Sequence, residues 1–345
     1  TAVAQKNLST RLNTFTIAFA ENKYDESQYA RQVAEYLRTN HTEMTVTQKD
    51  ALNLIPSILD TFDEPFADSS AIPTMLVSKL AKTQATMILS GDGGDELFMG
   101  YGAYRWAERL QKQSIKLLHK PLSFFLRQGN SWSKRGGNVL NYTNTENIPS
   151  HIFSQEQCLF SRKEISSILN PDLVRDIHLN EYPEVARTLS AGENQALFDM
   201  NYYLREDLLP KVDRSSMKYS LEVRVPLLDY TIVEFALNLN EKLKVHGDTQ
   251  KYLLRQVLYD YVPSNLFVRP KWGFSIPLEK WLQSDLSFLI DDYLNDNLIR
   301  KTGIFNQKEV QKLVRKFKSG RNGYLYNRIW QIILIQKFIS DKFNK

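Results

Sequence analysis

The stretch ATMILSGDGGDELFMGYGAYRWAERL at residues 85–110 contains the transition on which the fold depends. Its first five residues are a short, mainly apolar run, which predicts a buried strand. Its last fourteen residues repeat apolar side chains at helical spacing, which predicts a helix. A glycine-rich turn, Ser90 to Glu96, separates the two patterns. The stretch therefore predicts a strand, a tight turn and a helix in direct succession.

The same alternation of periods continues toward the N-terminus. Residues 12–19 (LNTFTIAF) are rich in β-formers, and Asp25 can cap a helix that follows them. A second strand is expected at residues 43–47, and helices are expected at residues 51–58, with a kink at Pro56, and 71–82. Strands separated by helices imply parallel βαβ units in an open α/β sheet. Ligands of such sheets bind beyond the carboxyl ends of the strands.

Beyond about residue 105 the pattern becomes mainly helical. Residues 128–149 are polar and contain glycines, so we expect a long mobile loop there. Further helices are expected at residues 194–205, 230–239, 251–261, 307–317 and 324–343. We therefore expect three consecutive parts: a partial nucleotide-binding region at 1–110, a helical and loop insertion at 111–190, and a helical region at 191–345 that completes the domain.

Composition restricts the class of protein. The single cysteine, Cys158, excludes an intramolecular disulfide framework and fits a reducing compartment, and the five scattered histidines argue against a histidine metal site. No apolar run approaches the ~20 residues that a membrane span requires. The first residues lack the apolar core of a signal peptide. We expect a cytoplasmic protein with no membrane partner.

The net charge of +5 arises from 44 basic and 39 acidic residues that are interspersed along the chain. The densest basic stretch runs from Arg105 to Arg135. Apolar residues recur within it at helical spacing, so we interpret it as a solvated amphipathic helix and loop, with an anionic partner as the alternative. A nucleic-acid partner is not expected, because such binding requires a clustered basic stripe.

The turn at Ser90 to Glu96 is the densest chemical signal. Glycines let backbone amides approach a ligand closely, and a helix N-terminus favours an anion. Its carboxylates, Asp92, Asp95 and Glu96, would repel a phosphate unless a cation lies between them, and Mg²⁺ takes one or two carboxylates together with phosphate oxygens. Spacing alone leaves two interpretations open: a nucleotide–metal site, or a structural turn whose acidic residues favour the first helical turn.

Two further clusters lie downstream. In the segment LPKVDRSSM–SLEVRVPLLD at residues 209–229, buried charges would have to be paired. For Glu222, Arg224 and Asp229 we favour an internal salt-bridge network that holds two helices, whereas Asp213 is expected to face a ligand. Lys271 follows a proline and precedes Trp-Gly, a context suited to a point charge aimed at phosphate, with a surface lysine as the alternative. The chain has no P-loop motif, since none of its 14 glycines precedes a lysine, and it has no G-x-G-x-x-G motif.

Together the clusters resemble the synthetase domain of the glutamine-hydrolysing asparagine synthetase family. The matching segments, in chain order, are FTIAF at 15–19, YDESQYARQVA at 24–34, DEPFADSSAIPT at 63–74, LSGDGGDELFMGY at 89–101, KVDRSSMKYSLEVRVPLLD at 211–229, KYLLR at 251–255 and RPKWGFSIPLEKWL at 269–282. The resemblance implies an open parallel sheet of the adenine-nucleotide α-hydrolase (ATP-pyrophosphatase) type with a large helical C-terminal part.

In that family ATP adenylates a side-chain carboxylate of aspartate, pyrophosphate leaves, and ammonia derived from glutamine attacks the acyl-adenylate. The resemblance implies ATP and Mg²⁺ as cofactors and assigns roles to the matching positions. The pyrophosphate and Mg²⁺ would be bound at Ser90, Gly91, Gly93 and Asp95. Asp92 would contact the substrate or intermediate, and Glu96, Asp213 and Arg214 would shape the substrate pocket. The adenine would lie against the strand containing Ile17 and Ala18, and Lys271 would stabilise the negative charge of the phosphates. Because removing one preorganised donor typically costs ~10²–10³ in rate, we expect that loss for Lys271→Ala in a complete enzyme.

The chain departs from the family pattern at two places. Met99 stands where many relatives have glycine, which we expect only to tighten the following helix. The family's Ser-Gly-Gly-x-Asp-Ser loop and its glutaminase domain have no counterpart in the given sequence, so we expect these residues alone to be inactive. Alternatives are a relative that amidates another carboxylate, such as a sugar acid, and a non-catalytic fragment; a homodimer is left open.

Overall fold

The computed structural model describes residues 1–19, 25–143, 147–175, 185, 187–267, 276–320 and 322–343. The chain forms two compact units. Unit 1 comprises Thr1–Phe62, Asp68–Gly100 and Leu204–Pro277, and unit 2 comprises Asp63–Ala67, Tyr101–Tyr203 and Leu278–Lys345. Both units are assembled from segments that are not consecutive. The expected division into three consecutive parts stays a prediction.

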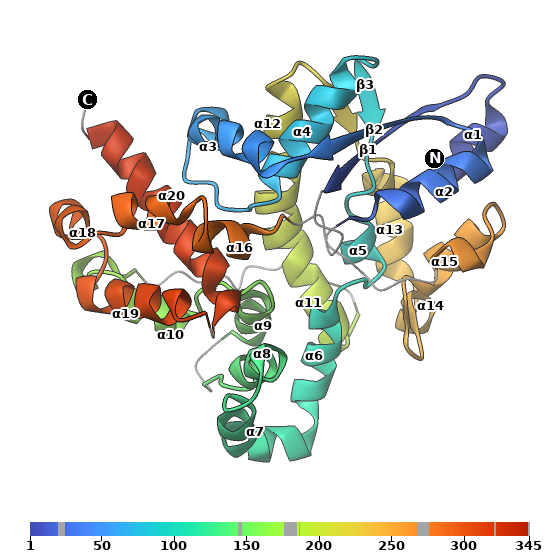
Figure 1. Ribbon diagram of the computed structural model, residues 1–345. Coiled ribbons are helices and arrows are strands. Elements are labelled where there is room, and N and C mark those ends of the chain that lie inside the picture. The colour runs from blue at the N-terminus through green and yellow to red at the C-terminus, as the bar shows by residue number, and fades with distance from the viewer. Residues whose placement is uncertain are drawn as a thin grey trace. The chain divides into compact units, whose positions relative to one another are not determined.

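Unit 1 holds small sheets among helices (Figure 1). In chain order its elements are α1 (Ala2–Asn7), β1 (Asn13–Phe19), α2 (Ser27–Leu37), β2 (Asn40–Val46), α3 (Gln48–Phe62), α4 (Ala71–Lys82), β3 (Met87–Leu89), α5 (Gly94–Leu97), α12 (Leu209–Met217), β4 (Glu222–Arg224), η4 (Pro226–Leu228), α13 (Tyr230–Asn238), α14 (Glu241–Lys244), β5 (Val245–His246), β6 (Thr249–Gln250), α15 (Tyr252–Tyr259) and η5 (Ser264–Phe267). The π-helix η3 (Asp199–Leu208) contains the boundary between the units.

The first sheet is a parallel pair, β1 and β2, joined by α2. Its register runs from Asn13 opposite Asn40 to Phe19 opposite Val46. Both α2 and α4 contact the pair, and the C-terminal half of β1 is buried. The expected strand–helix–strand unit at the start of the chain is therefore confirmed.

The second sheet pairs β3 with β4, which are more than a hundred residues apart in sequence. The strands are parallel, with Met87 opposite Glu222 and Leu89 opposite Arg224. The expectation that residues 85–89 are buried is wrong, because Met87 and Leu89 are 41% and 57% exposed. The third sheet, β5 and β6, is antiparallel.

The helix expected at residues 97–110 is interrupted. α5 ends at Leu97, and α6 begins only at Gly102. Between them Met99 adopts a positive φ of 55°. The glycine-rich turn therefore leads into a single helical turn of four residues, which limits the contribution of a helix dipole.

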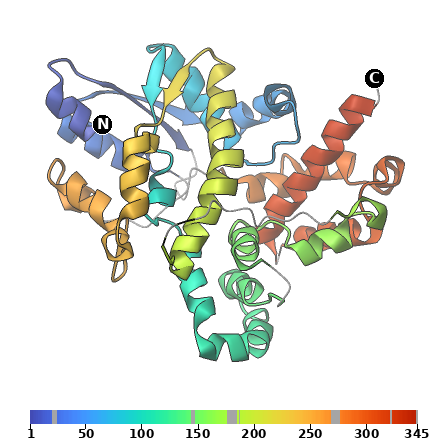
Figure 2. The same cartoon turned by 180° about the vertical axis from the view of Figure 1, so that it is seen from behind.

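Unit 2 is helical. Its main elements are α6 (Gly102–Gln111), α7 (Gln113–Leu126), α8 (Ser131–Val139), α9 (Ile148–Glu156), α10 (Arg162–Ile168), η2 (Pro171–Leu173), α11 (Ala191–Phe198), α16 (Leu278–Gln283), α17 (Ser287–Tyr293), α18 (Asp296–Thr302), α19 (Gln307–Lys318), η6 (Gly323–Leu325) and α20 (Tyr326–Phe343). α6 contacts α7, α9 and α11, while α20 contacts α16 to α19 (Figures 1 and 2). The mobile loop expected at residues 128–149 is a wrong prediction, because α8 and the start of α9 lie within it. Asn130 and Asn147 cap these two helices by accepting hydrogen bonds from Ser133 and Ser150 N–H groups.

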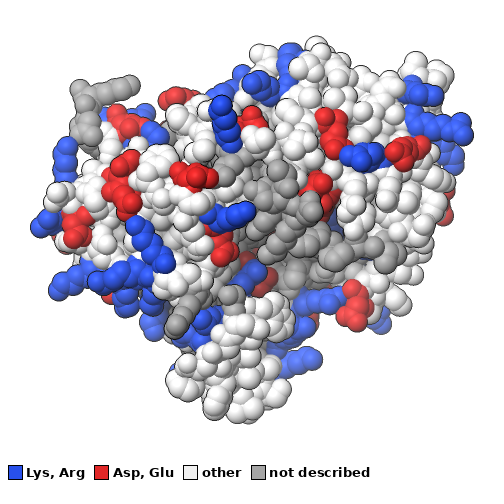
Figure 3. Space-filling model, viewed as in Figure 1, with Lys and Arg blue, Asp and Glu red and all other residues white. Residues whose placement is uncertain are grey.

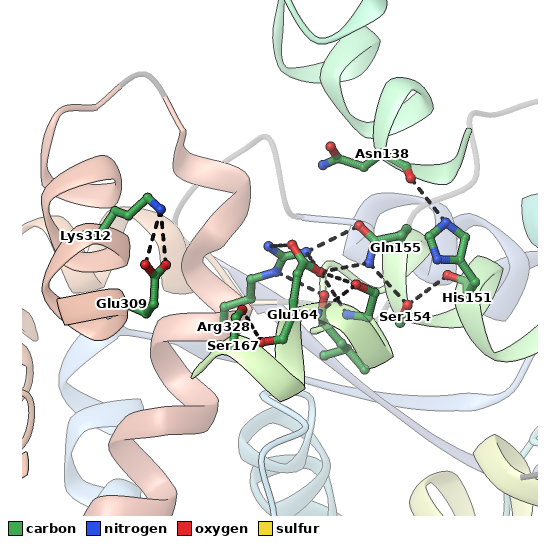
Figure 4. A network of polar contacts seen from close by, with 11 residues as sticks. Asn138, His151, Ser154, Gln155, Glu164, Ser167, Glu309, Lys312 and Arg328 are labelled. Carbon is green, nitrogen blue, oxygen red and sulfur yellow. Dashed lines mark hydrogen bonds and ion pairs between the residues drawn. The ribbon is translucent and has the colours of Figure 1, made fainter. Parts of the chain in front are cut away.

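A buried polar network links four helices of unit 2 (Figure 4). Arg328 on α20, 7% exposed, donates two hydrogen bonds to Glu164 on α10 at 2.7 and 3.0 Å and one to Gln155 on α9 at 3.3 Å. His151 on α9 bonds through Nε2 to the Val139 carbonyl at the end of α8 at 3.0 Å.

Within the described residues, no helix is both long and apolar enough to cross a membrane.

Candidate active site

The glycine-rich turn begins where β3 ends. The Ser90 N–H donates to the Arg224 carbonyl at 3.0 Å, which extends the β3–β4 pairing by one residue. The Ser90 hydroxyl donates to Oδ2 of Asp92 at 2.7 Å. The turn is therefore fixed at its first residue by a strand that comes from a distant part of the sequence.

The three glycines of this turn have different surroundings. A Cβ at Gly91 would meet no atom within 4 Å, so this glycine borders open space. Gly93 has a φ of 79°, and a Cβ there would collide with Leu228 of η4; a Cβ at Gly94 would come within 2.9 Å of Leu227. The backbone conformation of Gly93 therefore favours glycine, and Gly94 packs closely against Leu227, whereas Gly91 leaves the turn accessible to a ligand.

Unit 1 contains a cavity of about 760 Å³ at this turn. Leu89, Ser90, Gly91 and Asp95 form its part nearest the strand end. The remaining lining comes from α1, η4, α15 and their neighbours: Thr1, Ala2, Val3, Glu26, Gly100, Pro226, Leu227, Gln250, Lys251, Leu254, Arg255, Val257, Leu258, Tyr261 and Phe267. A mostly apolar wall with a few converging charges is typical of small-molecule sites.

One ion pair lies at the edge of this cavity. The Lys251 ammonium is 2.9 Å from Oδ2 of Asp95, and both side chains are about one quarter exposed (28% and 24%). A Cβ at Gly100 would overlap the Asp95 carboxylate, so a larger residue there would displace the pair. Sequence reasoning missed Lys251 and Arg255 as site residues. The signal was present in KYLLR at 251–255, since both basic residues of that matching segment line the cavity.

A second set of charges lies buried where α12 contacts α4. The ammonium of Lys211, a residue 6% exposed, donates to Oδ2 of Asp68 at 2.8 Å and to the Ser70 hydroxyl at 2.7 Å. Burial opposes the ionisation of both partners, but the ion pair and its hydrogen bonds keep the pKa of Asp68 below and the pKa of Lys211 above their ordinary values. Asp92 adds a further negative charge near Lys211.

Asp207 completes this buried set. Its Oδ1 is buried and accepts no hydrogen bond from the part of the chain that the structure describes. Burial, together with the nearby negative charge of Asp68, raises the pKa of Asp207 to about 7, although Lys211 opposes the shift. Asp207 can therefore gain or lose a proton near neutral pH, and groups with such shifted pKa values are concentrated at functional sites.

The other predicted site residues lie at various places in unit 1. Ile17 and Ala18 are buried core residues of β1, and Glu96 on α5 is buried. Asp213 and Arg214 are both exposed on α12, and Asp213 lies on the side opposite to the buried Lys211. Lys271 lies outside the described residues. The structure thus brings Ser90, Gly91 and Asp95 together at the cavity, with Asp92 bonded to Ser90.

The internal salt-bridge network expected for Glu222, Arg224 and Asp229 is a wrong prediction. Arg224 pairs with Glu222 at 2.7 Å, but both side chains are more than half exposed. Residues two apart on a strand share a face, which explains the local pair on β4. Asp229 instead caps α13 by accepting the Thr231 N–H at 3.0 Å.

No group of three or more histidine, cysteine or acidic side chains among the described residues could hold a metal ion. Asp95 is the carboxylate that lines the cavity directly, so it could contribute one ligand to a bound cation.

The family model described as asparagine synthase matches residues 1–340. The chain belongs to the asparagine synthase family. It is 30% identical over 99% of its length to asparagine synthetase [glutamine-hydrolyzing] 1 of Bacillus subtilis, covering 54% of that protein. It is 33% identical over 79% of its length to a putative asparagine synthetase [glutamine-hydrolyzing] of Mycobacterium tuberculosis, covering 42% of that protein. The chain therefore spans about half the length of the curated relatives that it matches.

Proposed function

We propose that this member of the asparagine synthase family performs ATP-dependent amide formation. A side-chain carboxylate of aspartate is activated as an acyl-adenylate with release of pyrophosphate, and ammonia released from glutamine attacks it to give asparagine. The observation that carries the proposal is the cavity at the carboxyl end of β3, where Ser90, Gly91 and Asp95 lie beside Lys251. The two parallel strand pairs, β1–β2 and β3–β4, support a sheet of the ATP-pyrophosphatase type.

The charged groups around this cavity are suited to binding a nucleoside triphosphate. Ser90 and the open space at Gly91 provide close access for phosphate oxygens, and the ammonium of Lys251 supplies positive charge. Asp95 would hold Mg²⁺, whose contribution is to neutralise the phosphates. Lys271 would add charge stabilisation from outside the described residues.

The adenine is proposed to lie toward β1. A second cavity of about 250 Å³ is lined by Thr14, Phe15 and Thr16 of that strand. Thr1 and Phe267 line both cavities, so the two spaces are adjacent. Ile17 and Ala18 would then act by shaping the strand from within the core.

The buried charged groups around Lys211 would bind the carboxylic acid substrate, aspartate, and take part in its reaction with ammonia. Asp92 and Asp207 are acidic groups near one lysine, and Asp207 changes its protonation near neutral pH. Ammonia attack releases a proton, and a carboxylate with a pKa near 7 is suited to accept it.

The decisive measurement is acid-dependent pyrophosphate release by the full-length protein, over a panel containing aspartate, glutamate and sugar acids. We expect aspartate to give the fastest release. Lys251→Gln and Asp95→Asn are expected to slow adenylation by about 10²–10³, and the exposed Lys242→Gln in the same unit serves as the matched control. Release without an acid preference, or unchanged rates in both site variants, would contradict the proposal.

A further inference from the structure

Helix α7 has an unusual distribution of polar and apolar side chains. Its two buried residues are polar: Ser123 donates from its hydroxyl to the Gly137 carbonyl at 2.7 Å, and Nδ1 of His119 bonds to the Leu140 carbonyl at 3.0 Å. The His119 ring also stacks on Tyr142 with ring centroids 4.2 Å apart. These contacts fix which face of α7 points toward the rest of unit 2.

The opposite face is exposed and apolar. Five large apolar residues of α7 and one tryptophan on α8 make up this surface, which we call the α7 patch: Leu117 (72% exposed), Leu118 (57%), Leu122 (37%), Phe124 (64%), Phe125 (71%) and Trp132 (80%). At 100° per residue, the five helical positions cover an arc of roughly 160°. The expected amphipathic helix is present as α7, but five of its large apolar residues are exposed rather than packed against unit 2.

The chain around the patch is purely basic. Residues 109–145 contain no aspartate or glutamate and seven basic residues: Arg109, Lys112, Lys116, Lys120, Arg127, Lys134 and Arg135. On the helical projection, Lys116, Lys120 and Arg127 fall along one edge of the apolar arc. Figure 3 shows an uncharged surface at the lower tip of the view, where Figure 1 draws α7, with lysines and arginines at its margins.

We propose that the α7 patch docks onto the surface of an anionic phospholipid bilayer. An exposed apolar face with aromatic residues, flanked by lysine and arginine, is the pattern of a helix that lies in the membrane interface. The basic edge would contact anionic headgroups, while Phe124, Phe125 and Trp132 would enter the boundary with the acyl chains. Such binding needs no spanning helix.

Other occupants fit the charge pattern less well. Pairing with a second copy of the patch would bring two sets of basic residues together with no acidic residue in this stretch to offset them. Nucleic acid would bind the basic edge but would leave the leucines and phenylalanines without a complementary surface. A bilayer with anionic headgroups satisfies both parts of the patch.

Sedimentation with vesicles tests the proposal. The full-length protein is mixed with phosphatidylcholine vesicles containing about one third phosphatidylglycerol, and with pure phosphatidylcholine vesicles. We expect binding to the anionic vesicles that weakens as salt is added. Lys116→Gln with Lys120→Gln should weaken it about thirtyfold, and Phe124→Ser with Phe125→Ser on the order of tenfold or more.

Matched substitutions elsewhere serve as controls. Lys163→Gln with Lys308→Gln removes two exposed lysines from other helices of unit 2, and Phe235→Ser removes an exposed phenylalanine from α13 of unit 1; both should bind as the parent does. Circular dichroism of each variant verifies folding. Equal binding to both vesicle types, or equal losses of binding in the control variants, would overturn the proposal. It would also be overturned if the patch substitutions changed only the oligomeric state in vesicle-free solution.

Discussion

Met99 adopts a backbone conformation that favours glycine. Its φ is 55°, yet its side chain is almost fully buried, with 2% exposed. The left-handed region costs a side-chain-bearing residue roughly 1–2 kcal/mol. Met99 therefore does not merely tighten the following helix, as the sequence suggested, but forms the turn between α5 and α6 at a conformational cost that burial offsets.

Two substitutions separate these contributions. Met99→Ala and Met99→Gly both remove the buried side chain, a loss of roughly 2–5 kcal/mol for Met→Ala. Only glycine relieves the backbone, so we expect Met99→Gly to be about 1 kcal/mol more stable than Met99→Ala in urea unfolding. The usual order, with alanine more stable, would contradict a strained Met99.

Asp207 should make stability depend on pH. Its pKa of about 7 lies above its ordinary value, so between about pH 4 and 7 the folded chain binds a proton that the unfolded chain lacks. Stability contributed by this group is thus present in acid and lost as the pH rises through 7. We expect Asp207→Asn to gain about 2–3 kcal/mol relative to the parent between about pH 5 and pH 8. If the free energies of unfolding of the two proteins changed equally with pH over that range, the raised pKa would be refuted.

Much of the candidate site could be predicted at this scale, but not all of it. Ser90, Gly91 and Asp95 follow a strand directly, and local sequence is enough to place them at its carboxyl end. Lys251 and Lys211 could not be located in the same way, because their partners, Asp95 and Asp68, lie more than a hundred residues away. Which face of α12 is buried decides that Lys211, not Asp213, meets the acidic groups.

Among the elements, α20 depends on a charge for its attachment to α10 and α9. Arg328 and Glu164 form a two-pronged ion pair, and Glu164 also completes the capping box of α10 with Ser161. The Arg328 side chain is buried, whereas that of Glu164 is 39% exposed, so water still reaches the carboxylate when Arg328 is removed. The sequence pattern predicted α20 at residues 324–343, but it predicted neither α9 and α10 nor this contact between the three helices.

A double-mutant cycle measures the contact. We expect Arg328→Met to lower the free energy of unfolding by about 1.5–3 kcal/mol. Adding Glu164→Gln should cost less in that background than in the parent, with a coupling of about 1–3 kcal/mol. Lys312→Met, which breaks the exposed pair with Glu309 in Figure 4, is the control and should change stability by less than about 0.5 kcal/mol. Additive effects of Arg328→Met and Glu164→Gln would exclude a coupled pair.

At the scale of the whole molecule, nucleotide binding should affect the two units unequally. The cavity is lined by unit 1 alone. We expect ATP with Mg²⁺ to slow amide hydrogen exchange of the full-length protein at residues 89–100 and 252–258, because binding suppresses local opening there. Exchange in α7 and α8 should be unchanged, and equal protection of these helices would contradict a site confined to unit 1.

The interleaving of the units has a consequence for synthesis on the ribosome. Unit 1 needs residues up to Pro277, and unit 2 needs residues up to the C-terminal helix. β3 therefore cannot pair until β4 has been translated, and α10 cannot form its ion pair until Arg328 has been translated. Neither unit can close while the nascent chain ends near residue 200, so both depend on the late segments. The exposed early helices are therefore candidates for chaperone binding during translation.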